Sequence, residues 1–441
     1  MSERSEKPSI IPTAAMDAWR DAGALRGAGA GRPSPLAALG RKLLLGQFAT
    51  LQHGELQIIE WDGQRHRFGK RTPRLDLAVT LQIDHPQLYA DAAFGGTVGA
   101  GEAYIRGLWR CDDLTGLVRL FVANRDMMNG MDSRWALVSR PLLKIFHFLN
   151  SNSRHGSARN IAAHYDLGNA LYESMLDPTM AYSCGIFAND NTTLEQASIA
   201  KFDAVCRKLQ LQAQDRVVEI GTGWGGLAIH AASRYGCHVT TTTISREQHD
   251  YARDKIARAG LGDRITLLLE DYRDLKGRYD KAFSIEMIEA VGAEYLDTYL
   301  AKCSSLLEPH GAMLLQAITI QDQFYEQASK SVDYIQRFIF PGSFIPSVET
   351  ISRSLTRATD LKIFGLEDIG PHYARTLREW RRNFFDQLPK VRALGYPESF
   401  VRLWEFYLCY CEGGFAERQL GDVQLLLTKP DCRLPSPALA T

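Results

Sequence analysis

The sequence lacks an excess of charge of either sign, a paired cysteine motif and a long apolar run. Its 441 residues include 51 Lys+Arg and 51 Asp+Glu, so the formal net charge is zero. A neutral chain has no global basic field that attracts nucleic acid, so we expect no nucleic-acid partner. None of the 8 cysteines stands in a C-x-x-C pair, which argues against a metal site and indicates a reducing compartment.

The sequence also lacks the apolar runs that are typical of a membrane-spanning helix or a signal peptide. No apolar run approaches the roughly 18–20 residues that a spanning helix requires. The first residues, Met1 to Pro8, are polar and charged and lack the apolar core of a signal peptide. We therefore expect a cytoplasmic protein whose contact with a membrane is peripheral, at its inner face.

Composition and periodicity divide the chain into a tail, a small module and a larger domain. Residues 1–35 are rich in Ala, Gly, Ser, Pro and Arg, which predicts a flexible tail. Residues 51–61 and 64–68 flank the turn Asp62-Gly63 and predict a β-hairpin. We place a small α+β module at residues 36–125, a connector at 126–157, the larger domain at 158–430 and a tail at 431–441.

The larger domain alternates strand patterns with helix patterns. Strands are expected at residues 217–220, 238–243, 265–269, 282–285 and 311–318, with amphipathic helices between them. This alternation predicts an α/β fold with a parallel, doubly wound sheet. A ligand then belongs at the carboxyl ends of the strands. Residues 423–427 predict a last strand at the edge of this sheet.

A glycine-rich turn follows the first of these strands. Gly221, Gly223, Gly225 and Gly226 carry no side chains, and a helix pattern begins directly after them. A strand, glycine turn and helix bring backbone N–H groups against a polar small molecule. A Walker loop would need a Lys that is absent. The dinucleotide pattern G-x-G-x-x-G fits, but it requires an acid about 20 positions on, where this chain has Thr240 to Thr243.

An acid lies instead two residues before the first glycine. The spacing Glu219-x-Gly221-x-Gly223-x-Gly225 resembles motif I of class I S-adenosylmethionine (SAM) methyltransferases, whose acid lies near the methionine end of the cofactor. A turn without a ligand and an NAD(P) site stay as alternatives at this point. Polar side chains also follow the next three strands, and together they favour a pocket over isolated helix caps. They are Thr243, Ser245 and Gln248, then Glu270 and Asp271, then Glu286 and Glu289.

Further motifs, in order along the chain, make the resemblance more specific. From roughly residue 50 to 428 the chain resembles the cyclopropane fatty acid synthase family. The motifs that carry this resemblance include Gly99-Ala100-Gly101-Glu102, His164-Tyr165-Asp166-Leu167, Leu176-Asp177-Pro178, Tyr182-Ser183-Cys184, Glu219 to Gly226, Thr243 to Gln248, Asp271-Tyr272, Ile288 to Gly292 and Phe340-Pro341-Gly342.

The resemblance implies a class I SAM-methyltransferase (Rossmann-like) domain after a small N-terminal module. It implies transfer of the SAM methyl group to a cis double bond of a membrane phospholipid's acyl chain. A carbocation forms, a base removes a proton, and a cyclopropane ring closes. The resemblance also implies that the protein forms a dimer. The residues that it assigns to the cofactor are Tyr182, Ser183, Glu219, Gly221, Gly223, Gly225, Thr243, Ser245, Gln248, Glu270 and Asp271.

In this family the base is a bicarbonate ion. The resemblance assigns Cys184, Glu289, Ile318 and Tyr373 to its site, with Gln316 where the family has a His. Ala290 replaces a second family His. Glutamine forms hydrogen bonds but carries neither charge nor a transferable proton at neutral pH. A lipid C-methyltransferase that makes a methyl-branched or further-processed chain is therefore the alternative to ring formation.

Two other predictions follow. The aromatic-rich residues 324–345 are expected to wall an acyl channel or to form a helical lid packed on the core. A protein that binds SAM or lipid without catalysis is a further alternative, and the retained Cys184, Glu289 and Tyr373 argue against it.

Overall fold

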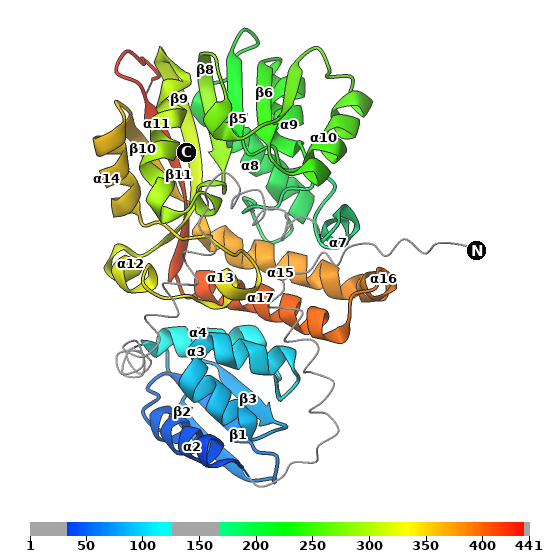
Figure 1. Ribbon diagram of the computed structural model, residues 1–441, viewed down its shortest axis with the longest axis vertical. Coiled ribbons are helices and arrows are strands. Elements are labelled where there is room, and N and C mark those ends of the chain that lie inside the picture. Colours follow the sequence, from blue (N-terminus) through cyan, green and yellow to red (C-terminus); the bar gives the residue numbers. More distant parts are fainter. Residues whose placement is uncertain (1–32, 126–166, 436–441) are drawn as a thin grey trace, which may run out of the picture.

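The structure is a computed structural model that describes residues 33–125 and 167–435. Two β-sheets lie at opposite ends of the molecule, and the long helices α15 (Gly370–Asp386) and α17 (Glu398–Ala416) lie between them (Figure 1). The predictions for residues 1–32, the connector 126–157, the motif residues 164–166 and the end of the chain, 436–441, lie outside the described residues. Pro35, placed in the predicted tail, already begins helix α2.

The smaller sheet belongs to the N-terminal module. Its 4 strands run in the order β2-β1-β3-β4, and β1 pairs with β2 antiparallel, as the predicted hairpin requires. Alternate residues of β1 are buried, including Leu56 and Ile58, because one face of the sheet packs against helices. The module's elements are α2 (Pro35–Phe48), β1 (Gly54–Ile59), β2 (Arg65–Lys70), β3 (Ala78–Ile83), α3 (Gln87–Ile105), β4 (Trp109–Cys111) and α4 (Leu114–Ala123).

The larger sheet has 7 strands in the order β10-β11-β9-β8-β5-β6-β7. The strands are β5 (Arg216–Ile220), β6 (His238–Thr243), β7 (Ile265–Leu269), β8 (Tyr279–Ile285), β9 (Leu307–Ile320), β10 (Lys362–Asp368) and β11 (Leu420–Thr428). Strands β9, β8, β5, β6 and β7 are parallel, which confirms the predicted doubly wound sheet.

The prediction of an edge strand at residues 423–427 is wrong. Strand β11 lies between β9 and β10 and is antiparallel to both. Residues 422–428 are all buried because neighbouring strands cover both sides of β11 and helices cover its faces. Strand β10, with its polar exposed end, forms the edge. This placement brings Asp422 and Gln424 into the interior of the domain.

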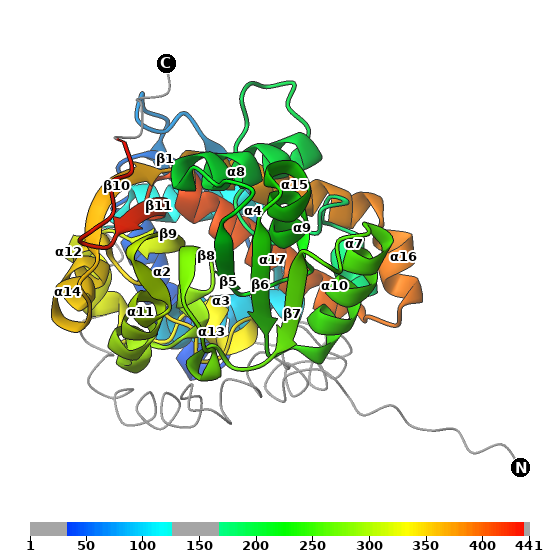
Figure 2. The same ribbon diagram turned by 90° about the horizontal axis from the view of Figure 1, so that it is seen from above.

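Helices cover both faces of the larger sheet, as Figure 2 shows from above. One core joins the sheet to α8 (Leu194–Leu209), α9 (Gly226–Tyr235) and α10 (Arg246–Arg258). The other joins it to α11 (Leu296–Ser305) and α14 (Val348–Ala358). The predicted capping box of Thr193 and Gln196 at the start of α8 is confirmed.

Helix α17 attaches the N-terminal module to the larger domain. A side chain at Gly413 would place its Cβ only 2.6 Å from Val118 of α4, so the two helices touch through this glycine. Beside it, Thr115 Oγ1 donates to Glu412 Oε2 at 3.2 Å, and Arg119 pairs with Glu417 at 2.7 Å. Within the described ranges, no helix is both long and apolar enough to cross a membrane.

Four shorter α-helices complete the described residues. They are α7 (Asn169–Glu173), α12 (Asp322–Ala328), α13 (Tyr334–Phe338) and α16 (Leu388–Ala393).

Candidate active site

The glycine turn between β5 and α9 leaves open space for a ligand. Gly221, Gly223 and Gly225 have φ values of 101°, 52° and 83°, a backbone region that favours glycine. A Cβ at Gly223 would meet nothing within 4 Å, whereas one at Gly226 would lie 2.7 Å from the carbonyl oxygen of Thr179. The turn therefore presents bare backbone at the start of α9, where N–H groups point outward.

A cavity of about 2040 Å³ extends from this turn to helices α13 and α17 and on to the N-terminal module. A site for one small molecule spans about 300–1,000 Å³, so this cavity has room for a cofactor and a second large molecule. The predicted cofactor residues that line it are Tyr182, Ser183, Glu219, Gly221, Gly223, Thr243, Gln248, Glu270 and Asp271.

Gly225 and Ser245 are not among the lining residues. Gly225 stands at the N-cap of α9, where a Cβ would lie 3.2 Å from that of Ala252. Ser245 caps α10, and its hydroxyl accepts a hydrogen bond from Gln248 N. Both residues shape the loops that present the neighbouring cofactor residues.

The lining groups on the cofactor side fit SAM. Glu219 is buried and accepts a hydrogen bond from Thr241 Oγ1 at 2.6 Å, and burial raises the pKa of its carboxyl to about 8. Trp224 and Tyr182 add aromatic rings to the same wall, and such rings attract a sulfonium cation. The open glycine turn offers N–H groups to a carboxylate or ribose.

A second polar cluster is centred on Glu286, which follows β8. Its carboxylate accepts hydrogen bonds from the backbone N–H of Cys184 at 2.8 Å, from Gln316 Nε2 at 2.8 Å and from the Tyr373 hydroxyl. The backbone of Glu286 has φ 48°, a strained region for a residue with a side chain. Strain at a single residue of this kind often marks a functional position.

The predicted catalytic residues thus lie close together, but the side chain that three of them contact is Glu286, which was not predicted to be catalytic. Cys184, Gln316 and Tyr373 all donate to Glu286, and the N–H of Ile318 donates to Glu289 Oε1 at 2.5 Å. Gln316 Nε2 also donates to Asp422 Oδ2 at 2.8 Å. These donors are already engaged with carboxyl groups of the chain, so none of them is free to hold a separate bicarbonate ion.

Burial and mutual repulsion determine the charge of this cluster. Burial raises the pKa of Glu289 to about 8 and, together with Glu286, holds the pKa of Asp422 well above its usual range. Burial also raises the pKa of Glu286, and the Tyr373 hydrogen bond opposes this rise. The raised pKa of Asp422 favours its neutral form, whereas the three donors on Glu286 favour the ionised form of that carboxyl.

Two other buried groups complete the cluster. Lys201 of α8 donates to Ser183 Oγ at 2.7 Å. Burial lowers the pKa of Lys201, and attraction to Glu286 is the largest opposing effect. The Cys184 thiol points to the carbonyls of Gly185 and Ile369, and burial raises its pKa, which disfavours the nucleophilic thiolate.

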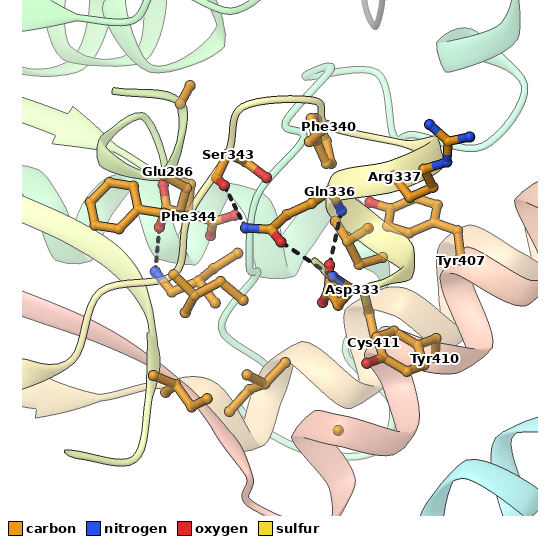
Figure 3. A pocket seen from close by; sticks show the side chains of 18 of the residues that line it. Glu286, Asp333, Gln336, Arg337, Phe340, Ser343, Phe344, Tyr407, Tyr410 and Cys411 are labelled. Atoms are coloured by element: carbon orange, nitrogen blue, oxygen red, sulfur yellow. Dashed lines mark hydrogen bonds between the residues drawn. The ribbon is translucent and has the colours of Figure 1, made fainter. Parts of the chain in front are cut away.

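Apolar side chains form the rest of the cavity wall. Figure 3 shows Phe344 beside Glu286, and Phe340 of the same segment on the side of Tyr407 of α17. The rings of Phe340 and Tyr407 lie 6.3 Å apart. Gln336 of α13 donates a hydrogen bond to the carbonyl of Ser343 at 2.9 Å and so links two parts of the segment 324–345. Residues of the segment 324–345 line the cavity, and Tyr334 and Phe338 pack on the core, so the predicted packing is confirmed. The acyl channel stays a prediction.

Sequence reasoning missed Lys201 and Asp422 and gave Glu286 no catalytic role. Glu286 was noted as a polar residue after a strand, which was the available signal. No local pattern distinguishes Lys201 from the other lysines of a helix or Asp422 from a residue of a turn.

The chain is similar to known proteins over most of its length. The family model described as mycolic acid cyclopropane synthetase matches residues 152–425. Tuberculostearic acid methyltransferase UfaA1 of Mycobacterium tuberculosis is 36% identical over 402 residues, which cover 89% of this chain and 91% of that protein. The cyclopropane-fatty-acyl-phospholipid synthase of Escherichia coli K12 is 35% identical over 351 residues, which cover 78% and 86%.

A solved structure is similar as well. The mycolic acid cyclopropane synthase CmaA1, complexed with SAH and CTAB, is 28% identical and superposes with a TM-score of 0.58. The match covers 62% of this chain and 98% of that one.

Proposed function

The chain belongs to the mycolic acid cyclopropane synthetase family and is a SAM-dependent lipid methyltransferase, and we propose that it methylates a cis double bond of an unsaturated phospholipid acyl chain. We further propose that Glu286 removes the proton that the reaction releases. The observation that carries the proposal is the Glu286 carboxylate, which lines the cavity and accepts hydrogen bonds from three donors.

Each step has a group in the cavity to support it. Bound SAM supplies an electrophilic methyl group to the alkene, which leaves a carbocation on the neighbouring carbon of the acyl chain. Phe340, Phe344 and the other apolar walls exclude water, which would otherwise trap that cation. The negative charge of the Glu286 carboxylate stabilises the cation, and the carboxylate then accepts one proton from the methylated acyl chain.

The proton that leaves decides the product. If a C–H bond of the new methyl group breaks and its electrons bond to the cationic carbon, a cyclopropane ring closes. If a C–H bond of the acyl chain beside the cationic carbon breaks instead, its electrons form a double bond, and the product is a methyl-branched, ring-free chain. If a hydride first moves from the methylated carbon to the cationic carbon, loss of a proton from the methyl group gives a methylene-substituted chain. All three products gain the same mass, and none requires an oxidant or a reductant.

We propose the ring-free product. The donors that the family resemblance assigns to bicarbonate are engaged with Glu286, so the base differs from that of ring formation. In addition, the relative named a methyltransferase covers more of this chain, 89% against 78%, than the relative named a cyclopropane synthase. Ring closure is the second candidate, favoured by the family and by the relative from Escherichia coli.

Purified protein, SAM with a trideuterated methyl group and vesicles of dioleoyl phosphatidylglycerol test the proposal. We expect release of S-adenosylhomocysteine and a modified oleoyl chain. Retention of all three deuterons excludes a ring, and retention of two leaves a ring or a methylene group, which proton NMR separates. If no S-adenosylhomocysteine forms, the proposed reaction is wrong.

Peripheral membrane contact, a cytoplasmic location and dimerisation stay predictions. Co-sedimentation with the same vesicles tests the first of them, and light scattering of the purified chain tests the last.

A further inference from the structure

A line of hydrogen bonds crosses the larger sheet from its surface to Glu286. Lys208 Nζ of α8 donates to Gln424 Oε1 at 2.5 Å, and Gln424 Nε2 donates to Gln316 Oε1 at 2.9 Å. Gln316 Nε2 then donates to Glu286 and Asp422, at 2.8 Å each. Gln424 and Gln316 are register partners on β11 and β9, so their side chains stand side by side.

We propose that Lys208 and Gln424 are positioning residues that fix the direction of the Gln316 amide and so keep its N–H groups on Glu286. The inference rests on the proposed role of Glu286 as the base. It assigns a function to residues that lie outside the cavity wall.

The direction of the line follows from the chemistry of its outer end. A lysine ammonium only donates hydrogen bonds, so Gln424 must turn its carbonyl oxygen toward Lys208. Its amide nitrogen then faces Gln316, which must offer its own oxygen. The Gln316 nitrogen is left facing Glu286 and Asp422, and it donates a hydrogen bond to each of them.

The opposite direction is strongly unfavourable. Gln424 would then set N–H groups against the Lys208 ammonium, and Gln316 would set an oxygen against the Glu286 carboxylate. Gln316 and Gln424 are 0% and 1% exposed, so water cannot relieve these repulsions. Lys208, with a side chain 21% exposed and paired with Glu367, is the outer end of the line.

The arrangement explains why a neutral side chain works at position 316. Gln316 cannot carry a proton, but a fixed amide donor favours the ionised form of Glu286. Loss of the fixed direction removes that donor and raises the pKa of Glu286. The other titratable groups that interact with Glu286 are Lys201, Cys184, Glu289, Tyr373 and Asp422.

Variants at the outer end test the proposal without touching the cavity. In Lys208→Met we expect kcat to fall about tenfold, as for one lost charge-assisted hydrogen bond. We also expect the acidic limb of the kcat–pH profile to move up by about one pH unit. Lys208→Arg keeps a donor-only cation and should retain most activity. Lys302→Met is the matched control, since Lys302 is half-buried on α11 and donates to the Leu275 carbonyl, away from the line.

A second measurement needs no turnover. Infrared titration of the protein labelled with ¹³C-carboxyl glutamate, subtracted against Glu286→Gln, reports the pKa of Glu286. We expect it to rise in Lys208→Met and in Gln424→Leu but not in Lys208→Arg or Lys302→Met. An unchanged value in folded Lys208→Met overturns the proposal. Failure of the proposed function would appear separately, as wild-type protein that titrates normally but transfers no methyl group.

Discussion

Replacing Glu286 with glycine separates a base built into the chain from one taken from solution. The substitution removes the carboxylate but leaves the Cys184 N–H, the Gln316 amide and the Tyr373 hydroxyl pointing at the vacated space. Three converging donors form an anion site. We therefore expect Glu286→Gly to lose activity and to regain part of it when a small carboxylate or bicarbonate is added.

The structure sets the size of each effect. Loss of a general base lowers kcat by about 10²–10⁴-fold. Stability should change less, because glycine at φ 48° relieves a strain of roughly 1–2 kcal/mol. That relief offsets part of the lost hydrogen bonds, which contribute about 1 kcal/mol each.

The assay is release of S-adenosylhomocysteine in buffer freed of carbon dioxide, with and without formate or bicarbonate. Wild-type protein should not respond to either anion. Glu286→Gln is the control, since its amide fills the space and should prevent rescue. Full activity of Glu286→Gly without added anion would refute the assignment of Glu286 as the base.

Three further predictions address single groups. Tyr373→Phe removes a hydrogen bond that lowers the pKa of Glu286, so the acidic limb of the kcat–pH profile should move to higher pH, as stopped assays from pH 5 to 9 would reveal. Glu219 has a folded-state pKa of about 8, above its value of 4.5 in an exposed chain, so its contribution to stability declines as pH rises through that window, by up to about 1.4 kcal/mol per pH unit. Urea unfolding at pH 5 and pH 9 should therefore show a smaller decline for Glu219→Gln than for wild type, and equal declines would contradict the pKa. Gly226→Ala places a Cβ 2.7 Å from the Thr179 carbonyl, so calorimetry should show SAM affinity lowered at least several-fold, while Gly262→Ala, in open space, should leave it unchanged.

Much of the fold was predictable because its signals are local. Alternating strand and helix patterns predicted the parallel sheet, and the turn Asp62-Gly63 predicted the first hairpin. The position of β11 inside the sheet was not predictable from its short apolar run. A buried inner strand and an edge strand covered by helices have similar sequences, and only the pairing with β9 and β10 distinguishes them.

Part of the candidate site was likewise predictable from the sequence, and part was not. The glycine turn and the polar strand ends were found by spacing, while Cys184 and Tyr373 were found by resemblance to a family. The sequence alone determined that a SAM-type turn, a polar rim at the strand ends and a lipid-modifying motif set occur in one chain. It also identified Gln316 and Ala290 as the departures that put the product in question.

Only the tertiary structure decided what those departures mean. The groups that donate to Glu286 are 102, 30 and 87 positions away from it along the chain. Gln424, which orients Gln316, is 108 positions from it. Local patterns reflect backbone periodicity over a few residues, whereas the charge and direction of a buried side chain depend on whichever distant groups the packed sheet brings beside it. For that reason, the carboxylate that replaces the expected anion became visible only when the strands were assembled.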